Sequence, residues 1–424
     1  MNKPDLLSHQ DPHRWMVFFT ICMVYFFVYF HRVSTSVIVK DLLNAFDTNA
    51  TALGFMSSIY FYIYAFEQPL VGFLSDRLGP RRVIGWWSIG AALGCFIFAA
   101  APNILWASLG RALIGFGVGG VYVPAIKAFS LWFQKKDFAT VLGFLMSVGN
   151  LGAVIATTPL AWATDAYGWR PTFLLIGGIT LLLSILTFTL TRDHDSSISA
   201  DRFNSTPDSA PSKGSRRIFV QILLSWKFWM ISLIFFGIYG TVLTLQGLWA
   251  TPFLMSALGI ERIPASRLNM LIPIGVIVGS PLIGWILDRF SFNKQNTVMA
   301  IIVLYALPWV GIIFFPETLG ILGLSMLFFI MGVMTGGFIS TFWGFVRDTT
   351  PSDIFGLTSG MLNPAPFFGV AVFQVLTGAV LDKAGRIGDL YPLSAYKHAF
   401  LICFFSILVC LALSLVLRRM KELR

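Results

Sequence analysis

The sequence predicts an all-α integral membrane protein with twelve transmembrane helices, arranged as two pseudo-symmetric six-helix bundles. Three observations predict this fold class. Of the 424 residues, 56% are hydrophobic and only 12% are charged, whereas soluble domains carry about 25% charged residues. Apolar runs of membrane-spanning length recur along the whole chain. One motif from the first half of the chain also recurs in the second half, so we expect lipid to be the main solvent of a duplicated bundle.

Each predicted span is an apolar run of roughly 20 residues, the length that crosses about 30 Å of hydrocarbon. The runs lie at 15–38, 51–73, 83–101, 104–130, 138–162, 169–190, 226–255, 268–288, 297–315, 319–346, 354–380 and 395–417. The first run is longer than the apolar core of a signal peptide and lacks a convincing cleavage site, so we expect it to remain as the first span.

Basic residues near the ends of the short loops predict the orientation, because cytoplasmic loops are rich in Lys and Arg. One side of the predicted bundle collects Arg77, Arg81, Arg82, Lys135, Lys136, Arg289, Lys294, Arg347, Arg418, Arg419, Lys421 and Arg424. We therefore expect a multi-pass protein of the cell's inner (plasma) membrane with both termini in the cytoplasm. This topology also explains the net charge of +10, so nucleic acid is not an expected partner.

A polar segment separates the two predicted bundles. Residues 191–217 are rich in Ser, Asp and Pro and contain few large apolar side chains, a composition that cannot build a core and is typical of a flexible linker. We therefore divide the chain into an N-terminal bundle at 1–190, a cytoplasmic linker at 191–225 and a C-terminal bundle at 226–424. We expect the protein to be a monomer in the lipid bilayer.

An internal repeat is the strongest signal in the sequence. Pro69 to Arg77 reads PLVGFLSDR at the end of the second span, and Pro281 to Arg289 reads PLIGWILDR at the end of the eighth. Asp76 and Asp288 lie 212 positions apart, which is half the length of the chain. Chance similarity is the alternative, but the equal position within each half favours a parallel duplication, which is one construction of secondary transporters.

The first copy continues as GFLSDRLGPRR from Gly72 to Arg82, and this motif resembles the signature between the second and third spans of the major facilitator superfamily. The resemblance extends from end to end of the chain and implies the major facilitator fold. In that family the acidic residue latches the two halves on the cytoplasmic side in the outward-open state. The residues to which the resemblance assigns gating are Gly72, Asp76, Arg77, Arg81, Asp288 and Arg289. Topology alone is the alternative explanation of the arginines.

The first span carries a candidate substrate anchor. Tyr25, Tyr29, Arg32 and Ser36 are spaced 4, 3 and 4 residues apart and therefore share one helical face. A charged side chain inside a span costs at least about 2.5 kcal/mol, so Arg32 is a candidate for function. It lies roughly 26 Å above Trp15 at about 1.5 Å per residue, and snorkelling to the interface is the alternative.

The fourth span carries a second embedded arginine. Arg111, Gly115, Val118 and Tyr122 share a face, and Arg111 together with Arg32 would clamp an anion. A structural role for Arg111 in joining loops and helices is the alternative. Near the cytoplasmic end of this span we interpret Lys127 as a snorkelling residue.

The motif around Arg111 resembles the fourth span of the family. With Trp132-Phe133 and the segment from Gly168 to Phe173, it brings the chain nearest to the organic anion (anion:cation symporter) and sugar-phosphate branches. His31 and Val118 stand where the anion:cation branch usually has acids. Both usual proton carriers of that branch are therefore missing.

Two other residues are candidates for proton coupling. His31 titrates near neutral pH when it is unperturbed. Glu67 shares a face of the second span with Tyr60 and Tyr64. Helix packing is the alternative for His31, and a structural ion pair or hydrogen bond is the alternative for Glu67.

The C-terminal half offers neutral polar and aromatic candidates for the substrate site, although packing alone explains many such residues. The candidates are Tyr239, Gln246, Trp249, Trp343 and Asn363. We also expect Pro252, Pro364 and Pro366 to break or kink their helices.

The leading interpretation is a secondary active transporter, a symporter that moves a small organic anion by alternating access and is coupled to protons. An efflux transporter for a drug, metabolite or siderophore is the first alternative, and a non-transporting membrane sensor or receptor is the second. We expect no enzyme activity, cofactor or metal site, since the four cysteines lie in apolar runs without metal-ligand spacing. The sequence does not name the substrate.

Overall fold

A computed structural model describes residues 13–192, 213–290, 293–350 and 354–422. The described chain is helical apart from turns and one isolated β-bridge between Ile387 and Leu390. The helices of the first half are α1 (His13–Val33), η2 (Ser34–Val37), α2 (Val39–Ala45), α3 (Ala50–Leu78), α4 (Pro80–Ala100), α5 (Ile104–Gly119), α6 (Tyr122–Trp132), α7 (Lys135–Ile155), α8 (Thr158–Tyr167) and α9 (Trp169–Leu190).

The second half has the same all-helical character. Its helices are α11 (Lys213–Leu224), α12 (Trp226–Thr244), η3 (Leu245–Trp249), α13 (Ala250–Leu258), α14 (Arg262–Asn269), α15 (Leu271–Phe290), α16 (Lys294–Phe314), α17 (Pro316–Thr349), α18 (Phe355–Leu362), α19 (Ala365–Ala384) and α20 (Leu393–Glu422). α11 lies inside the predicted linker, so the last part of that segment is helical, and residues 193–212 lie outside the described chain.

Most helices are long and apolar enough to cross a membrane. Ten described segments satisfy this condition, and the pair formed by α7 and α8, bent by 41°, adds an eleventh. The remaining predicted span is the second, at 51–73, which corresponds to α3. α3 has 29 residues and is long enough to cross the membrane, but Glu67, Gln68 and three tyrosines make it more polar. It packs between α5 and α19, where Glu67 and Gln68 are buried, while apolar residues on its other face are exposed.

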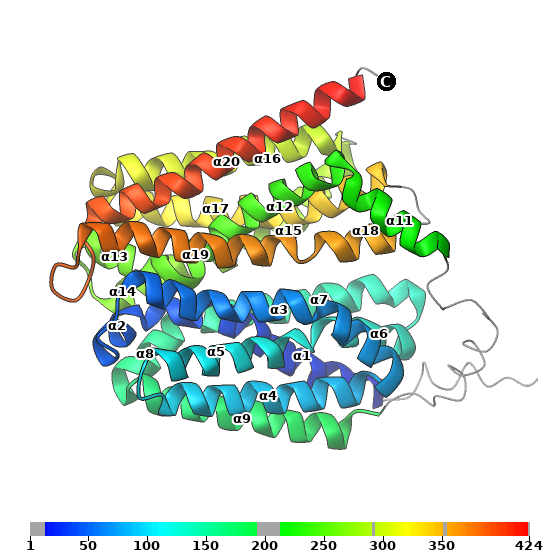
Figure 1. The fold of residues 1–424 in the computed structure, drawn as a ribbon, viewed down its shortest axis with the longest axis horizontal. Helices are drawn as coiled ribbons and strands as arrows, with labels where there is room; N and C mark the ends of the chain where they lie inside the picture. Colours follow the sequence, from blue (N-terminus) through cyan, green and yellow to red (C-terminus); the bar gives the residue numbers. More distant parts are fainter. Residues whose placement is uncertain (1–12, 193–212, 291–292, 351–353, 423–424) are drawn as a thin grey trace, which may run out of the picture.

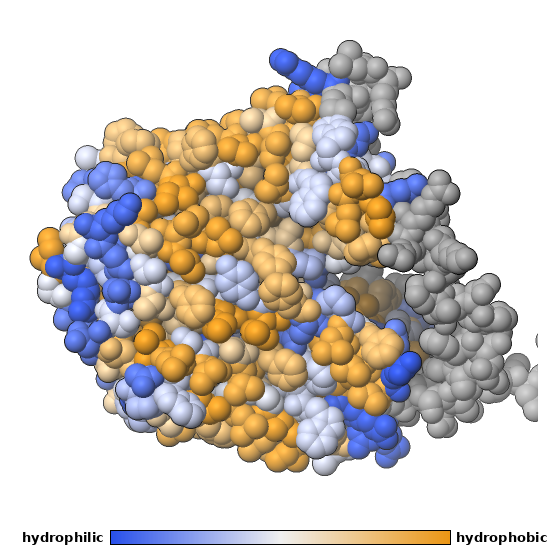
Figure 2. Space-filling model, viewed as in Figure 1, coloured by the Kyte–Doolittle hydropathy of each residue, from blue (hydrophilic) through white to orange (hydrophobic). Residues whose placement is uncertain are grey.

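The outer surface shows how the bundle sits in lipid. Figure 2 shows a broad hydrophobic band over the middle of the molecule, with hydrophilic residues gathered toward its two ends. Large apolar side chains such as Phe66, Leu105 and Leu322 are exposed in this structure. Their exposure is expected where lipid tails replace water.

Four of the predicted spans contain a break between two α-helices. The breaks lie at Gly120–Val121, Ala156–Thr157, Met270 and Asn363–Pro364. The span at 226–255 instead continues through η3, a π-helical segment, which is a geometry often found at functional sites. The prediction of a break is confirmed at Pro364, and Pro366 lies in the first turn of the helix that follows, α19. Pro252 lies in the first turn of α13, so the irregular segment of its span, η3, comes directly before it.

Figure 1 shows α1 to α9 on one side of the molecule and α12 to α20 on the other. Between the two sets of helices, α3 packs against α19 and α7 packs against α15. The division at 191–225 stays a prediction about independent domains. Within this arrangement, the substrate path is expected to follow the boundary between the two sets.

The two ends of the bundle carry different elements. α1 begins and α20 ends at the same end, here called the terminal end (Figure 1). At the opposite end, here called the far end, lie α2, α8, α14 and the loop 385–392. Sharp turns between spans depend on left-handed glycines, since Gly79 (φ 84°) precedes α4 and Gly168 (φ 83°) precedes α9.

Candidate substrate site

A cavity of about 230 Å³ lies between the two sets of helices. We call it the central cavity; α1, α7, α12, η3, α15 and α17 form its wall. It is lined by Tyr29, Arg32, Val33, Met146, Asn150, Ala153, Tyr239, Val242, Leu243, Gln246, Pro273, Val276, Ser280, Thr335, Ile339 and Ser340.

A larger cavity of about 410 Å³, here called the side cavity, adjoins the central one between α7 and α15. The two share Met146, Asn150, Val276 and Ser280. The side cavity also reaches Thr140, which lies near the start of α7. The combined space therefore extends from the middle of the molecule toward the terminal end.

Arg32 is the one charged residue among the described residues that line these two cavities. Its side chain is buried, and its Cζ lies 4.4 Å from the ring centroid of Tyr29, 5.1 Å from that of Tyr64 and 5.2 Å from that of Phe367. Cation–π contacts of this kind stabilise a guanidinium that has little water. Nε of Arg32 has no hydrogen-bond partner among the described residues, and none of the ion pairs between described residues involves Arg32.

The other aromatic residues predicted on the first span gather beside Arg32. Tyr25 stacks on Tyr122 with ring centroids 5.7 Å apart and contacts Tyr29 at 5.5 Å. The hydroxyls of Tyr25 and Tyr29 lie 3.6 and 3.9 Å from Sδ of Met146 on α7. Tyr29 therefore lines the central cavity, while Tyr25 and Tyr122 support it from behind.

Arg111 is not on the cavity wall. Its Nη1 donates a 3.1 Å hydrogen bond to the backbone carbonyl of His31, and its Cζ lies 4.8 Å from the ring of Tyr60. The side chain is fully buried among α1, α3 and α5. The predicted clamp of two arginines is therefore not assembled in this conformation, and the geometry matches the structural alternative.

The two candidate proton carriers also lie behind the cavity. Glu67 accepts a 3.0 Å hydrogen bond from Nε1 of Trp87, and its Oε1 is buried without a partner. A side chain at Gly119 would overlap that oxygen, so Glu67 faces α4 and α5. His31 is buried, with Nε2 3.7 Å from Sγ of Cys95.

The candidates from the C-terminal half divide into two groups. Tyr239 and Gln246 line the central cavity. Nε1 of Trp249 instead donates to Oγ1 of Thr377 at 2.8 Å inside the C-terminal helices. Trp343 packs on Phe235, and Asn363 caps the C-terminal end of α18; neither lines the cavity.

The predicted gating residues lie at the terminal end. Oδ1 of Asp76 accepts a 2.8 Å hydrogen bond from Nζ of Lys127 on α6. Lys127 is therefore a partner of the motif, and its partly exposed ammonium lies at the terminal end, which agrees with the interpretation as a snorkelling residue. Arg77 stacks on Phe73, and Arg81 donates to the carbonyl of Phe188.

The second copy of the motif is less well defined. Arg289 is exposed on α15, and the side chain of Asp288 lies outside the described residues. A Cβ added at Gly72 or Gly284 would have no atom within 4 Å. Neither glycine is in close contact with another helix in this conformation.

Polar contacts join the two sets of helices at the far end. Arg262 on α14 pairs with Asp41 on α2 at 2.7 Å and with Asp165 on α8 at 3.2 Å. Burial raises the pKa of the Asp41 carboxyl above its usual range, although the adjacent Arg262 opposes the shift. These contacts hold α14 against the first half of the chain.

A second group of contacts lies beside Arg262 at the far end. Asp389 pairs with Lys40 at 2.7 Å and accepts from Asn44 at 3.2 Å. The hydrogen bonds from Lys40 and Asn44 lower the pKa of Asp389. Asp382 accepts hydrogen bonds from the backbone N–H groups of Ala50 and Thr51 at the start of α3, both at 2.8 Å. Together these contacts close the far end.

Several lining residues were not among the sequence candidates. Asn150 on α7, Ser280 on α15, and Thr335 and Ser340 on α17 all reach the central cavity. Small polar residues are common in membrane helices as packing residues, so their type alone gave no signal. The position of Ser280 directly before the repeated motif was the one available hint.

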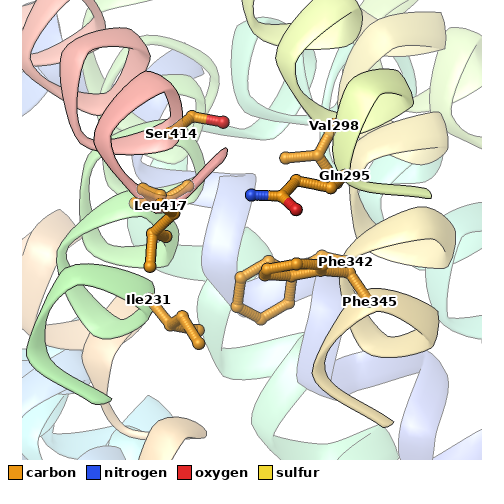
Figure 3. A pocket seen from close by; sticks show the side chains of 8 residues that line it. Ile231, Gln295, Val298, Phe342, Phe345, Ser414 and Leu417 are labelled. Carbon is orange, nitrogen blue, oxygen red and sulfur yellow. The ribbon is translucent and has the colours of Figure 1, made fainter. Parts of the chain in front are cut away.

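A third void lies inside the C-terminal helices and is too small for a substrate. Figure 3 shows Gln295 and Ser414 pointing into it between Phe342 and Leu417. Its volume of about 10 Å³ is at the lower limit for holding one water molecule. The central cavity is therefore the candidate site.

A helical membrane bundle with a cavity between two sets of helices, closed at one end, is the arrangement of a secondary transporter. The Major Facilitator Superfamily model matches residues 21–372, and the chain belongs to this family. This match confirms the resemblance drawn from the Gly72–Arg82 motif. The protein is a multi-pass integral membrane transporter and not an enzyme.

Among curated proteins, the chain is similar to the probable sulfoacetate transporter SauU of Cupriavidus necator, with 25% identity over 88% of each chain. It is also similar to a probable hexose phosphate transport protein of Chlamydia trachomatis, with 22% identity over 70% of this chain and 69% of the relative. Among solved structures, a bacterial homologue of the human lysosomal transporter Spinster superposes with a TM-score of 0.80 at 15% identity, covering 97% of this chain and 98% of that one.

Proposed function

We propose that the protein is a secondary transporter of a small organic anion and that Arg32 is the anchor for the anion. The observation that carries the proposal is a buried guanidinium at the wall of a cavity, with Nε unpartnered and no carboxylate among the described lining residues. A buried charge is normally paired, so an anionic ligand is the natural partner. The names of the relatives from Cupriavidus necator and Chlamydia trachomatis, sulfoacetate and hexose phosphate transporters, support the same class of substrate.

The proposed transport cycle alternates access to the central cavity. In the structure the far end is held shut by contacts such as Arg262 with Asp41, and the side cavity leads toward the terminal end. The excess of Lys and Arg near the terminal end supports a cytoplasmic location for that end and for both termini. This conformation is then the inward-facing one of the cycle.

We further propose that transport is coupled to protons through Glu67. Its Oε1 is buried without a partner, and a carboxyl group in this position is neutralised more easily than one that is paired. Glu67 lies three residues after Tyr64, whose ring contacts Arg32. A change in the charge of Glu67 would therefore affect anion binding at Arg32 through α3.

The test of the anchor is uptake by purified protein in liposomes, screened with organic acids and sugar phosphates. Arg32→Gln should lower uptake by more than about tenfold, because a hydrogen-bonded charge contributes about 1.5–3 kcal/mol. Arg267→Gln is the matched control, since Arg267 is exposed on α14. Unchanged uptake by Arg32→Gln, with normal purification, would remove Arg32 from the site and with it the proposed function.

A further inference from the structure

The charge of the central cavity indicates the charge of its ligand. We propose that the cavity selects an organic anion with one negative charge and several hydroxyl groups, and that it discriminates against dianions of the same size. This inference rests on the proposed function and narrows its substrate class. It separates this chain from the relatives named above, because sulfoacetate and hexose phosphates carry about two negative charges near neutral pH.

The first step is the number of positive charges available to a ligand. Arg32 is the one charged residue among the described residues lining the central and side cavities. The second embedded arginine, Arg111, is held behind Tyr60 by its hydrogen bond to the carbonyl of His31. A bound anion therefore meets one guanidinium and not two.

The second step is the chemistry of the wall formed by α17. Thr335 donates its hydroxyl hydrogen to the carbonyl of Met331 at 2.8 Å, and Ser340 donates its own to the carbonyl of Gly337 at 3.1 Å. Each hydroxyl has a single hydrogen, so both present acceptor lone pairs to the cavity. These two acceptors on α17 bind ligand hydroxyls and repel a second carboxylate or phosphate charge placed beside them.

The remaining polar lining groups are the hydroxyls of Tyr29, Tyr239 and Ser280 and two amides, and none of them carries a charge. Asn150 and Gln246 are neutral amides, and Nδ2 of Asn150 already donates to the carbonyl of Met146 at 3.0 Å. A second negative charge would be buried against neutral groups, which is much more costly than burying a hydrogen-bonded hydroxyl. A site whose groups accept hydrogen bonds from ligand hydroxyls also discriminates between ligands more strongly than an apolar pocket does.

The third step is size. The part of the combined space that Arg32 lines is the central cavity, whose volume of about 230 Å³ is below the range of about 300–1,000 Å³ that is typical of sites for drug-sized ligands. A sugar acid of three to six carbons is therefore the appropriate probe. Gluconate and glucarate form a matched pair, because they share a six-carbon hydroxylated chain and differ only in a terminal hydroxymethyl or carboxylate.

The experiment measures binding of both ligands to the purified full-length protein by calorimetry and by thermal shift. Gluconate should bind at least about tenfold more tightly than glucarate, which corresponds to about 1.4 kcal/mol. Glycerate and tartronate provide the same comparison on a three-carbon chain. Equal or tighter binding of the dianion in the pair that binds overturns the inference and leaves the proposed function intact. Binding of neither pair also overturns the inference, and the absence of any response to other organic acids or to sugar phosphates overturns the proposed function itself.

A positive charge added to the cavity wall tests the same inference in the opposite direction. Gln246→Lys and Asn150→Lys place a second cation on the cavity wall, so each should shift the preference toward glucarate. Asn296→Lys is the control, because Asn296 is exposed at the start of α16. A preference that moves equally in the control, or that stays unchanged in both well-folded cavity variants, contradicts the inference.

Discussion

At the scale of single residues, the two embedded arginines differ in what surrounds them. Arg32 contacts three aromatic rings and a cavity. Arg111 contacts a backbone carbonyl and one ring, and its Nε and Nη2 have no partner among the described residues. The same side chain thus lines a cavity in one position and joins helices in the other.

We predict that Arg111→Gln destabilises the protein without abolishing ligand binding. The variant loses the hydrogen bond to the carbonyl of His31, which contributes about 1.5–3 kcal/mol when the donor is charged. Thermal unfolding followed by intrinsic fluorescence should show a melting temperature lower by several degrees, as expected for about 2 kcal/mol. A normal melting temperature together with a lost ligand-induced shift would instead place Arg111 in the site.

The sequence predicted the position of Arg32 on a cavity wall better than that of Arg111, and the reason is local. Tyr25, Tyr29 and Arg32 lie on one unbroken helix, α1, so their spacing translates directly into a shared face. Arg111 and Tyr122 were placed on one face by the same argument, but α5 ends at Gly119 and α6 begins at Tyr122. Helical spacing carries no information across such a break.

At the scale of elements, the short helices α2, α8 and α14 form the closure of the far end. They are joined by Arg262, whose side chain is 13% exposed and contacts two carboxylates. Hydropathy predicted the spans but not these short helices, since a break within an apolar run does not change its composition. Ion pairs between residues as far apart in sequence as Arg262 and Asp41 or Asp165 give no signal in a single sequence.

We predict that Arg262→Gln opens the far end more often. Truncating one partner of a largely buried charge pair costs about 2–5 kcal/mol, so the closed arrangement loses population. The measurement is the rate at which a membrane-impermeant maleimide labels Val37→Cys, since Val37 is buried in η2 next to η3. Labelling should rise at least about tenfold in Arg262→Gln.

The matched control for this experiment is Arg267→Gln on the same helix, where the arginine is exposed. It removes the same charge from α14 without removing the contacts to Asp41 and Asp165. Equal labelling in the two variants would show that loss of charge, and not loss of the inter-helix contacts, affects the far end.

At the scale of the whole molecule, the repeated motif predicted a duplicated architecture, and the matched family confirms that fold. The sequence offset between the two copies of the motif indicated the duplication because it relates one whole set of helices to the other. The polar lining of the cavity could not be predicted in the same way, because Asn150, Ser280 and Thr335 come from three different helices. Their meeting depends on how the two sets of helices pack.

Coupling is a property of the whole molecule, and we predict that Glu67→Gln uncouples it. The amide keeps the shape of the side chain but carries no titratable proton, so accumulation driven by a pH gradient should be lost. Exchange of labelled for unlabelled substrate at equal pH on both sides should persist, since it needs only the anion site. Accumulation that survives in Glu67→Gln would remove this residue from the coupling mechanism.

The open space around Gly72 and Gly284 has one more consequence. Nothing in the present conformation requires either position to be glycine, since an added methyl group would meet no neighbour. If a need for glycine exists, it belongs to the conformation in which the terminal end is shut. Alanine at either position should then leave the thermal stability of the present conformation unchanged. The same substitutions should lower the transport rate, because transport also requires the other conformation.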